Sequence, residues 1–341
     1  MVYFTSDYTA GAHPEVMRLL NETNLLHTSG YGVDEFTAHA REMILEECGI
    51  PEGMVYFLVG GTQTNTVVID RLLERNDGVL SADSGHINVH EAGAIELTGH
   101  KVLTLPTVDG KINSHDIREY ISTFYCDETH AHMVRPAMVY ISFPTELGTL
   151  YSLKELQEIS DVCQEAGIPI YVDGARMAYG LSGKGNDVTL KDIAALCDVF
   201  YIGGTKCGAL FGEAVVTRRP ELLPRFQSLV KMHGALLAKG RLLGLQFEAL
   251  FTDGLYYRLG KEAVRLAMKM KQGIKEKGYR LFIDSPTNQQ FALLPNNVLE
   301  KLAKVAAFEY WGAAGKQESH VRFVTDWTTT DHDIDILLDA L

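Results

Sequence analysis

IPIYVDGAR (residues 168–176) and DVFYIGGTKCG (residues 198–208) are the two stretches that decide the fold. In each, a run rich in Ile, Val and Tyr predicts a buried β-strand, and small or polar residues follow where the run ends. Asp173 and Lys206 therefore stand where a strand gives way to a loop. Ligands of open α/β sheets bind at the carboxyl ends of the strands, so we expect both side chains at one site.

The same alternation extends along the first two thirds of the chain. Further strands are expected at 54–59, 101–105 and 137–142, and helical spacing of apolar residues is found in 67–73 and 152–166. Strands that alternate with helices predict an α/β fold with a large, mostly parallel sheet covered by helices.

From about residue 235 the pattern changes. Two long helical stretches, 235–251 and 255–277, precede strand candidates at 281–283, 290–294 and 320–325. We therefore expect an N-terminal segment plus a large domain over residues 1–240, and a smaller C-terminal α+β domain over residues 241–341. No Pro, Gly or Ser linker marks the boundary, so the joint is expected to be a continuous helix.

Composition narrows the class of partner. The 341 residues carry 31 Lys and Arg against 44 Asp and Glu, a formal charge of −13 that disfavours nucleic acid and anionic membranes. The five cysteines form no CxxC pair, the chain opens without a signal-peptide pattern, and no apolar run approaches the ~20 residues of a membrane span. These features predict a soluble cytoplasmic protein with reduced thiols and no structural metal.

The first strand leads into a possible phosphate site. Gly60-Gly61-Thr62-Gln63 stands between that strand and a helix, where small residues and free N–H groups suit a phosphate. Taken alone, each of the three features also has an ordinary structural interpretation: Gly60–Gln63 as a turn before a helix, Asp173 as a helix cap and Lys206 as a turn lysine. Together, in this order, they supply what pyridoxal phosphate needs: a phosphate seat, a carboxylate for the pyridine nitrogen and an amine for covalent attachment.

Six ordered motifs resemble the threonine aldolase family, the low-specificity L-threonine aldolase and β-eliminating lyase group of fold-type I pyridoxal-phosphate enzymes. They are Ser6-Asp7-Tyr8-Thr9, Tyr31-Gly32 with Phe36-Thr37, Gly60–Asn65, His86-Ile87 with Glu91-Ala92-Gly93-Ala94, Asp173-Gly174-Ala175-Arg176, and Arg322-Phe323-Val324-Thr325. The resemblance covers nearly the whole chain and implies the aspartate-aminotransferase fold.

By resemblance, each motif residue acquires an expected role. The cofactor would be attached to Lys206, paired at its nitrogen with Asp173, contacted at its ring hydroxyl by Arg176 and stacked on by His86. Its phosphate would lie on Gly61, Thr62 and Gln63, with Lys239 of a neighbouring subunit, or its rival Arg241, as the cation. Ser6, Arg322 and Tyr31 would bind substrate, and Glu91 would orient neighbours or water. A homodimer or homotetramer with shared active sites follows, with Lys239 and Tyr31 near a partner's cofactor.

One motif departs from many relatives. Where many aldolases carry Thr-His-Asn, this chain reads Pro144-Thr145-Glu146-Leu147-Gly148. The base for the substrate β-hydroxyl is therefore open between His86, Glu146 and a water held by Glu91.

The resemblance implies a pyridoxal-phosphate-dependent carbon–carbon lyase. It would split L-threonine, L-allo-threonine or a phenylserine-like substrate into glycine and an aldehyde. Another pyridoxal-phosphate reaction, such as β-elimination, transamination or racemisation, is the alternative. A regulator without turnover is disfavoured because no DNA-binding segment is left over, and a dehydrogenase because no GxGxxG follows a strand.

Overall fold

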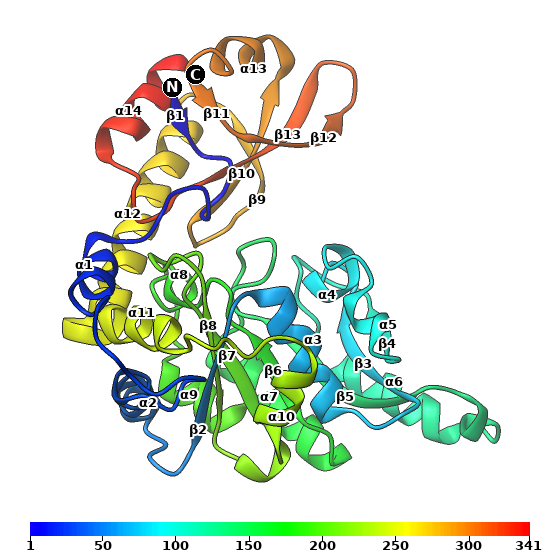
Figure 1. Cartoon of the computed structure of the whole chain (residues 1–341). Coiled ribbons are helices and arrows are strands. Elements are labelled where there is room, and N and C mark those ends of the chain that lie inside the picture. The colour runs from blue at the N-terminus through cyan, green and yellow to red at the C-terminus, as the bar shows by residue number, and fades with distance from the viewer.

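The computed structural model describes all 341 residues and is built around three sheets (Figure 1). The largest has seven strands in the order β2-β8-β7-β6-β5-β3-β4. Their bounds are β2 Met54–Leu58, β3 Asp77–Ala82, β4 Lys101–Leu105, β5 Arg135–Ser142, β6 Ile170–Asp173, β7 Val199–Gly203 and β8 Glu213–Thr217. Only β8 runs against the others, so the sheet is mostly parallel, as the sequence predicted.

Successive side chains of each strand point to opposite faces of this sheet, and both faces are buried. On β7, Val199 and Tyr201 join the core on one face, whereas Phe200 and Ile202 join the core on the other. Helices cover both faces (Figure 1). Those that precede the C-terminal part are α1 Pro14–Glu22, α2 Glu35–Cys48, α3 Gly61–Leu72, α4 His86–Val89, α5 Ala94–Leu97, α6 Ser114–Cys126, α7 Leu153–Ala166, α8 Met177–Leu181, α9 Leu190–Leu196, α10 Phe226–Met232 and α11 Arg241–Phe251.

The local sequence fixes where individual helices begin and end. At α7, Ser152 and Glu155 form a capping box, each side chain accepting the other's backbone N–H. Gly167 ends that helix with φ 67°, a left-handed conformation that glycine adopts without a steric cost. The chain can then turn directly into β6 and deliver Asp173 to the strand end.

The C-terminal part has its own core. Its antiparallel sheet, in the order β12-β13-β10-β9, lies beside the long helix α12 (Figure 1). The elements are α12 Leu255–Glu276, β9 Arg280–Ile283, β10 Gln289–Pro295, α13 Asn296–Leu302, β11 Ala306–Ala307, β12 Glu309–Ala314, β13 Glu318–Val324 and α14 Asp331–Ala340. The N-terminal strand β1 (Val2–Tyr3) pairs with β11, and Val2 and Phe4 are buried in this core.

Several elements differ from the sequence prediction. Strands β3, β8 and β12 were not predicted, because DGVLSA, EAVVT and EYWGAA are short or rich in residues of low strand preference. The helix expected from residue 235 begins at Arg241. Gly240 packs against the backbone of Gly32, where a side chain would collide. The segment before Gly240 is therefore shaped by this contact with the loop around Gly32, and its helical spacing of apolar residues does not produce a helix.

The division near residue 240 stays a prediction. Helix α11 packs on α1 and α2, whereas α12 contacts α8 as well as α14 and β10. We propose that the joint lies within α12, which is continuous over 22 residues. No helix in the chain is both long enough and apolar enough to span a membrane.

Candidate active site

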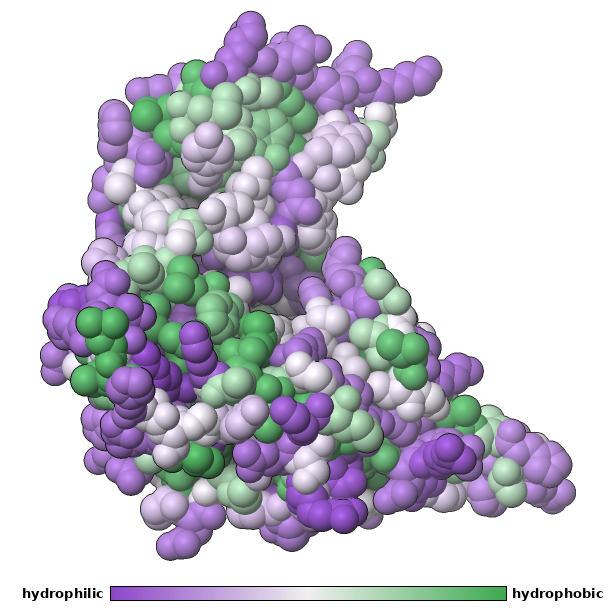
Figure 2. Space-filling view, viewed as in Figure 1, coloured by the Kyte–Doolittle hydropathy of each residue, from purple (hydrophilic) through white to green (hydrophobic).

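The carboxyl ends of the parallel strands meet at one cavity of about 310 Å³. The surface is hollowed between the large-sheet part and the C-terminal part (Figure 2). Eight residues of the lining matter for the chemistry of the site. Glu213 begins β8, and the other seven lie at or after the end of a strand: Gly61, Thr62, His86, Glu146, Asp173, Arg176 and Lys206. Seven of these were expected at the site, and Glu213 was not.

Asp173 ends β6 as a buried carboxylate surrounded by donors. Tyr201 donates to one carboxylate oxygen at 2.5 Å, and Tyr140 and Asn65 donate to the other at 2.7 and 3.0 Å. Burial raises the pKa of Asp173, but the charge of His86 and these hydrogen bonds outweigh it, so the pKa lies below its ordinary value. The group is therefore held as an anion, which suits a partner for a protonated ring nitrogen.

Lys206 follows β7 and lines the same cavity as Asp173. Gly174 and Gly203 allow this proximity: a side chain on Gly174 would collide with the backbone of Tyr201, and one on Gly203 with that of Ala175. Burial and the nearby charge of Arg176 lower the pKa of the Lys206 amine, against the opposing charges of nearby carboxylates. A depressed pKa favours the neutral, nucleophilic amine.

His86 begins α4 and is oriented by Glu91. Its Nδ1 lies 2.7 Å from Glu91 Oε1, and the same oxygen accepts from the side-chain amide of Asn65 at 2.7 Å. Burial lowers the pKa of His86, but the hydrogen bond that the imidazole makes to Glu91 and the charge of Asp173 raise it by more, so the net shift is upward. Glu91 is buried behind His86 and is not among the residues that line the cavity.

Glu146 lies in the loop that follows β5 and lines the cavity. Its Oε1 accepts from the backbone N–H of His86 at 2.9 Å and from the hydroxyl of Ser142 at 2.7 Å. Burial raises the pKa of its carboxyl above the ordinary value. The group is thus close to His86, and its raised pKa makes it a better proton acceptor than an ordinary carboxylate.

The predicted phosphate loop is divided between two roles. Gly61 and Thr62 line the cavity at the start of α3, where helix N–H groups are free. Gln63 instead accepts a hydrogen bond from Val59 N–H at 3.1 Å and does not line the cavity. In this structure the side chain of Gln63 stabilises the turn between β2 and α3.

A second arginine, Arg322, lies in the C-terminal part, and neither it nor Ser6 is among the residues that line the cavity. Arg322, on β13, donates to Gln289 at 2.8 Å, forms an ion pair with Glu309, and lies 5.5 Å from the ring of Trp311. Its Nε is buried without a partner. Ser6, near the N-terminus, is also buried with an unpartnered hydroxyl. Two unsatisfied buried donors are a feature that a bound carboxylate would explain.

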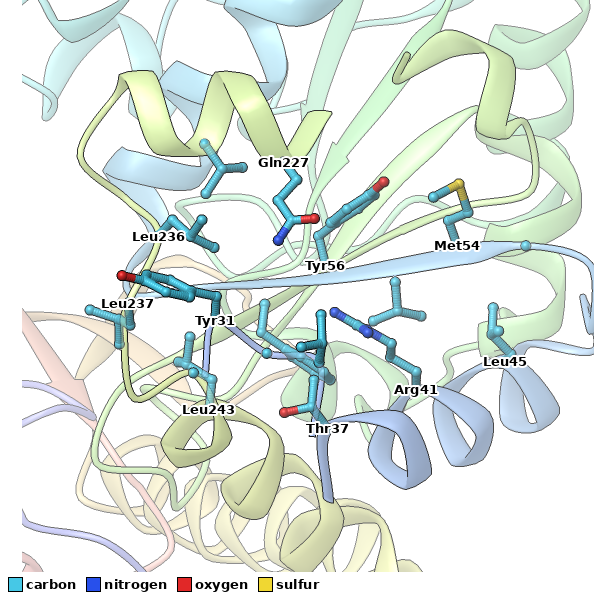
Figure 3. A pocket seen from close by; sticks show the side chains of 17 residues that line it. Tyr31, Thr37, Arg41, Leu45, Met54, Tyr56, Gln227, Leu236, Leu237 and Leu243 are labelled. Carbon is cyan, nitrogen blue, oxygen red and sulfur yellow. The ribbon is translucent and has the colours of Figure 1, made fainter. Parts of the chain in front are cut away.

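Tyr31 and Lys239 lie away from this cavity. The N–H of Tyr31 donates to Ala238, and the ring of Tyr31 faces Lys231 at 4.8 Å. Tyr31 lines a separate, largely apolar cavity of about 340 Å³, in which Arg41 has no hydrogen-bond partner (Figure 3). Lys239 is exposed, whereas the rival Arg241 donates to backbone carbonyls of the α1–α2 loop.

Comparison with known proteins decides the family. A family model described as "Beta-eliminating lyase" matches residues 4–294. The solved structure of Leishmania major threonine aldolase superposes with a TM-score of 0.96 at 40% identity, covering 99% of this chain and 98% of that one. The chain belongs to the threonine aldolase family.

Other threonine aldolases are more distant. The low specificity L-threonine aldolase of a Pseudomonas strain is 28% identical over 337 residues, covering 96% of this chain and 93% of the relative. Aspartate aminotransferase from Thermus thermophilus superposes with a TM-score of 0.72 at 14% identity, over 100% and 90% of the two chains, which shows the shared fold alone. Membership of the family makes this chain a lyase, and the family works with pyridoxal phosphate.

Sequence reasoning missed several residues around Asp173 and Arg176. Tyr140 and Tyr201 read as strand interior, because aromatic residues in alternating runs are usually core. Asp7 and Asn65 were part of quoted motifs but had no assigned partner. Their contacts join residues more than one hundred positions apart, and no local pattern reports such distances.

Proposed function

We propose that this threonine aldolase splits a β-hydroxy-α-amino acid, such as L-threonine or L-allo-threonine, into glycine and an aldehyde. The single observation behind the proposal is that Lys206, an amine with a lowered pKa, and Asp173, a buried carboxylate surrounded by hydrogen-bond donors, line one cavity. The chain's own residues fit pyridoxal phosphate there. Lys206 would carry it, Asp173 would hold the proton on its nitrogen, and Gly61 and Thr62 at the N-terminus of α3 would receive its phosphate.

Three further residues surround the expected ring position. His86 would stack on it, with Nδ1 committed to Glu91 and Nε2 free. Arg176 keeps two of its nitrogens on Asp7, so at most its remaining nitrogen is available for the ring hydroxyl. Lys239 of a second subunit would complete the phosphate seat.

The bound cofactor would supply an electron sink for the bonds to the substrate Cα. The protein decides which bond breaks by fixing the carboxylate. The Nε of Arg322 and the hydroxyl of Ser6 are the unsatisfied donors that would bind it, while the terminal nitrogens of Arg322 stay on Gln289 and Glu309. With the carboxylate fixed, the Cα–Cβ bond can be the one that lies perpendicular to the ring.

Cleavage also needs a base for the β-hydroxyl proton. His86 lines the cavity, and its Nε2 is free. Glu146, which lies 60 residues further along the chain, has a carboxyl with a raised pKa and accepts a hydrogen bond from the backbone N–H of His86. We assign ring placement and part of the base role to His86, with Glu146 as the second candidate. Glu91 acts through His86 and is a positioning residue.

We further propose that a second copy of the chain covers the face around Tyr31. Exposed apolar side chains gather in the segments that meet there, namely Leu25, Leu26, Tyr31, Val33 and Met232. They adjoin the apolar cavity drawn in Figure 3, and apolar surface is visible on this side of the molecule (Figure 2). Monomers rarely expose so much apolar surface in one place. A homodimer or homotetramer would bring Lys239 and Tyr31 to a partner's cavity.

A cytoplasmic location completes the proposal. All five cysteines are unpaired, and four of them are buried. Unpaired thiols are typical of a reducing compartment.

The test of the function has two parts. The purified protein, incubated with pyridoxal phosphate, should be yellow, and borohydride should bleach it and label Lys206. A screen of β-hydroxy amino acids should then release an aldehyde and glycine in equal amounts. Labelling of another lysine would contradict the site. Ammonia and a keto acid in place of aldehyde would assign elimination or transamination instead.

A further inference from the structure

Glu213 is a buried carboxylate at the cavity that no motif singled out. It begins β8, which is the antiparallel strand of the large sheet, so its first residue lies at the same edge as the last residue of β7. The strand register pairs Glu213 with Gly203, three residues before Lys206. Its side chain lines the cavity that Lys206 also lines.

The Glu213 carboxylate has two neutral donors and no close cation. One oxygen accepts from the hydroxyl of Thr205 at 2.7 Å, and the other from the N–H of Gly204 at 3.2 Å. The side chain forms none of the ion pairs found within 4.0 Å, and the residue is 3% exposed. Burying an anion without a partner is costly, so such a group tends to take up a proton. Burial accordingly raises the pKa of Glu213 to about 8, against the opposing hydrogen bond of Thr205 and charge of Lys206.

The other charges near Lys206 are already matched. Arg176 is held by Asp7 in a bidentate pair. Asp173 is ringed by donors and is assigned to the cofactor nitrogen, and His86 is paired with Glu91. Glu213 is the carboxyl left to balance Lys206.

We propose that Glu213 is the acid–base partner of Lys206. Before the Lys206 amine can attack a carbonyl carbon, an N–H bond of its ammonium must break with the electron pair staying on nitrogen. Because the two side chains form no ion pair within 4.0 Å, the proton passes through one water of the cavity to a carboxylate oxygen of Glu213, where an O–H bond forms. One cation and one anion become two neutral groups, so the net charge of the buried cavity does not change. The inference rests on the proposed attachment of pyridoxal phosphate to Lys206.

The first test follows the Glu213 proton directly. Infrared difference spectra are recorded between the cofactor-free wild type and the same protein after pyridoxal phosphate is attached and fixed by borohydride. We expect the carbonyl stretch of a protonated carboxylic acid to appear when the cofactor is attached, and to be missing from the difference spectrum of Glu213→Gln. Because the wild-type spectrum needs no variant, a variant that fails to fold does not remove the test. A loaded wild type without a protonated carboxyl band overturns the proposal.

The second test uses the pH dependence of attachment, followed by the appearance of the chromophore. Two coupled groups that share one proton titrate as a pair. Around neutral pH the wild-type rate should therefore change little with pH. In Glu213→Gln the lone amine must lose its proton to water, and its rate should rise about tenfold per pH unit below its pKa.

The ratio of the attachment rates of wild type and Glu213→Gln at each pH does not depend on the ionisation of the cofactor itself, because that ionisation affects both rates equally. Glu155→Gln, which removes a carboxylate paired with Lys111 outside the cavity, is the matched control and should follow the wild type. Parallel profiles for wild type and Glu213→Gln would overturn the acid–base role. A wild type that never forms the link at Lys206 would instead contradict the proposed function, so the two failures are distinct.

Discussion

Asp7 and Arg176 form a bidentate ion pair across 169 residues of sequence, with Nε and one terminal nitrogen of the guanidinium 2.7 and 3.0 Å from the two carboxylate oxygens. The Asp7 side chain is fully buried, and Asn288 donates to it at 3.0 Å. The pair ties the N-terminal segment, and Ser6 with it, to the loop that follows β6. The position of Ser6 relative to the end of β6 therefore depends on this contact.

Replacing Asp7 by Asn should destabilise the protein by about 3–5 kcal/mol, because Arg176 is left as a buried charge without a counterion. Burial raises the pKa of Asp7, but the charges of Arg176 and Lys206 lower it more, so the folded-state pKa lies below the ordinary value. Its stabilisation is therefore present above the unfolded pKa and is lost as pH falls through the folded value. Urea unfolding at several pH values should show a smaller acid loss in the variant. An unchanged midpoint at neutral pH would contradict the prediction.

Replacing Arg322 by Lys should remove most cleavage activity while the yellow colour is kept. A single ammonium cannot bind Gln289 and Glu309 and also place a donor at the position of Nε, and the contact with the Trp311 ring would be weakened as well. Initial rates and the absorbance of the bound cofactor are measured on the same sample. Arg280→Lys, on the exposed surface of the C-terminal sheet, is the control and should behave like wild type. Normal turnover in Arg322→Lys would remove this residue from the substrate site.

Replacing His86 by Asn or Glu146 by Gln should identify the β-hydroxyl base. Cleavage requires removal of that proton, whereas exchange of the glycine α-proton involves no hydroxyl. We expect cleavage to fall more than exchange in the variant that lacks the base, by about 10²-fold or more. Both rates are read by proton NMR in deuterated water. If the two rates fall together in each variant, neither side chain is the base and a bound water takes that place.

Replacing Glu91 by Gln should lower the pKa of His86 and so move the pH dependence of cleavage to lower pH. Burial alone would lower the pKa of His86, and the hydrogen bond and charge of Glu91, with the charge of Asp173, raise it above the ordinary value. Removing the Glu91 charge lowers the pKa, so neutral imidazole, the form able to act as a base, becomes available at lower pH. The NMR titration of His86 measures this without turnover. Asp70→Asn, which breaks the His233–Asp70 pair outside the cavity, should leave the His86 titration unchanged.

Introducing charge on the face around Tyr31 should separate the subunits. Val33→Glu with Met232→Glu places two carboxylates among exposed apolar side chains, and a dimer would have to bury them. We expect a monomer by light scattering, with most activity lost because Lys239 and Tyr31 no longer reach a partner. Leu97→Glu, at a residue that is 87% exposed on α5, is the control. An active wild-type monomer at assay concentration would disprove the shared site.

The sequence alone determined the architecture of the large sheet and the residues that follow its strands. Short, continuous apolar runs followed by Gly60, Asp173 and Gly203 locate β2, β6 and β7, because strands buried on both faces are typically apolar throughout. The sequence could not locate β3 or β8, whose residues are typical of turns or are too few to form a pattern. Glu213 was missed with β8.

Only the tertiary structure decided how the predicted residues divide into groups. It joined His86, Glu146, Asp173 and Lys206 at one cavity and left Tyr31 and Lys239 outside it. It also set Glu91 behind His86 and enclosed Asp173 between Tyr140 and Tyr201. The physical reason is that strand order and helix packing, not spacing along the chain, determine which strand ends become neighbours. A motif specifies the chemical groups that a chain brings to its site, and burial among particular neighbours then sets their charge and orientation.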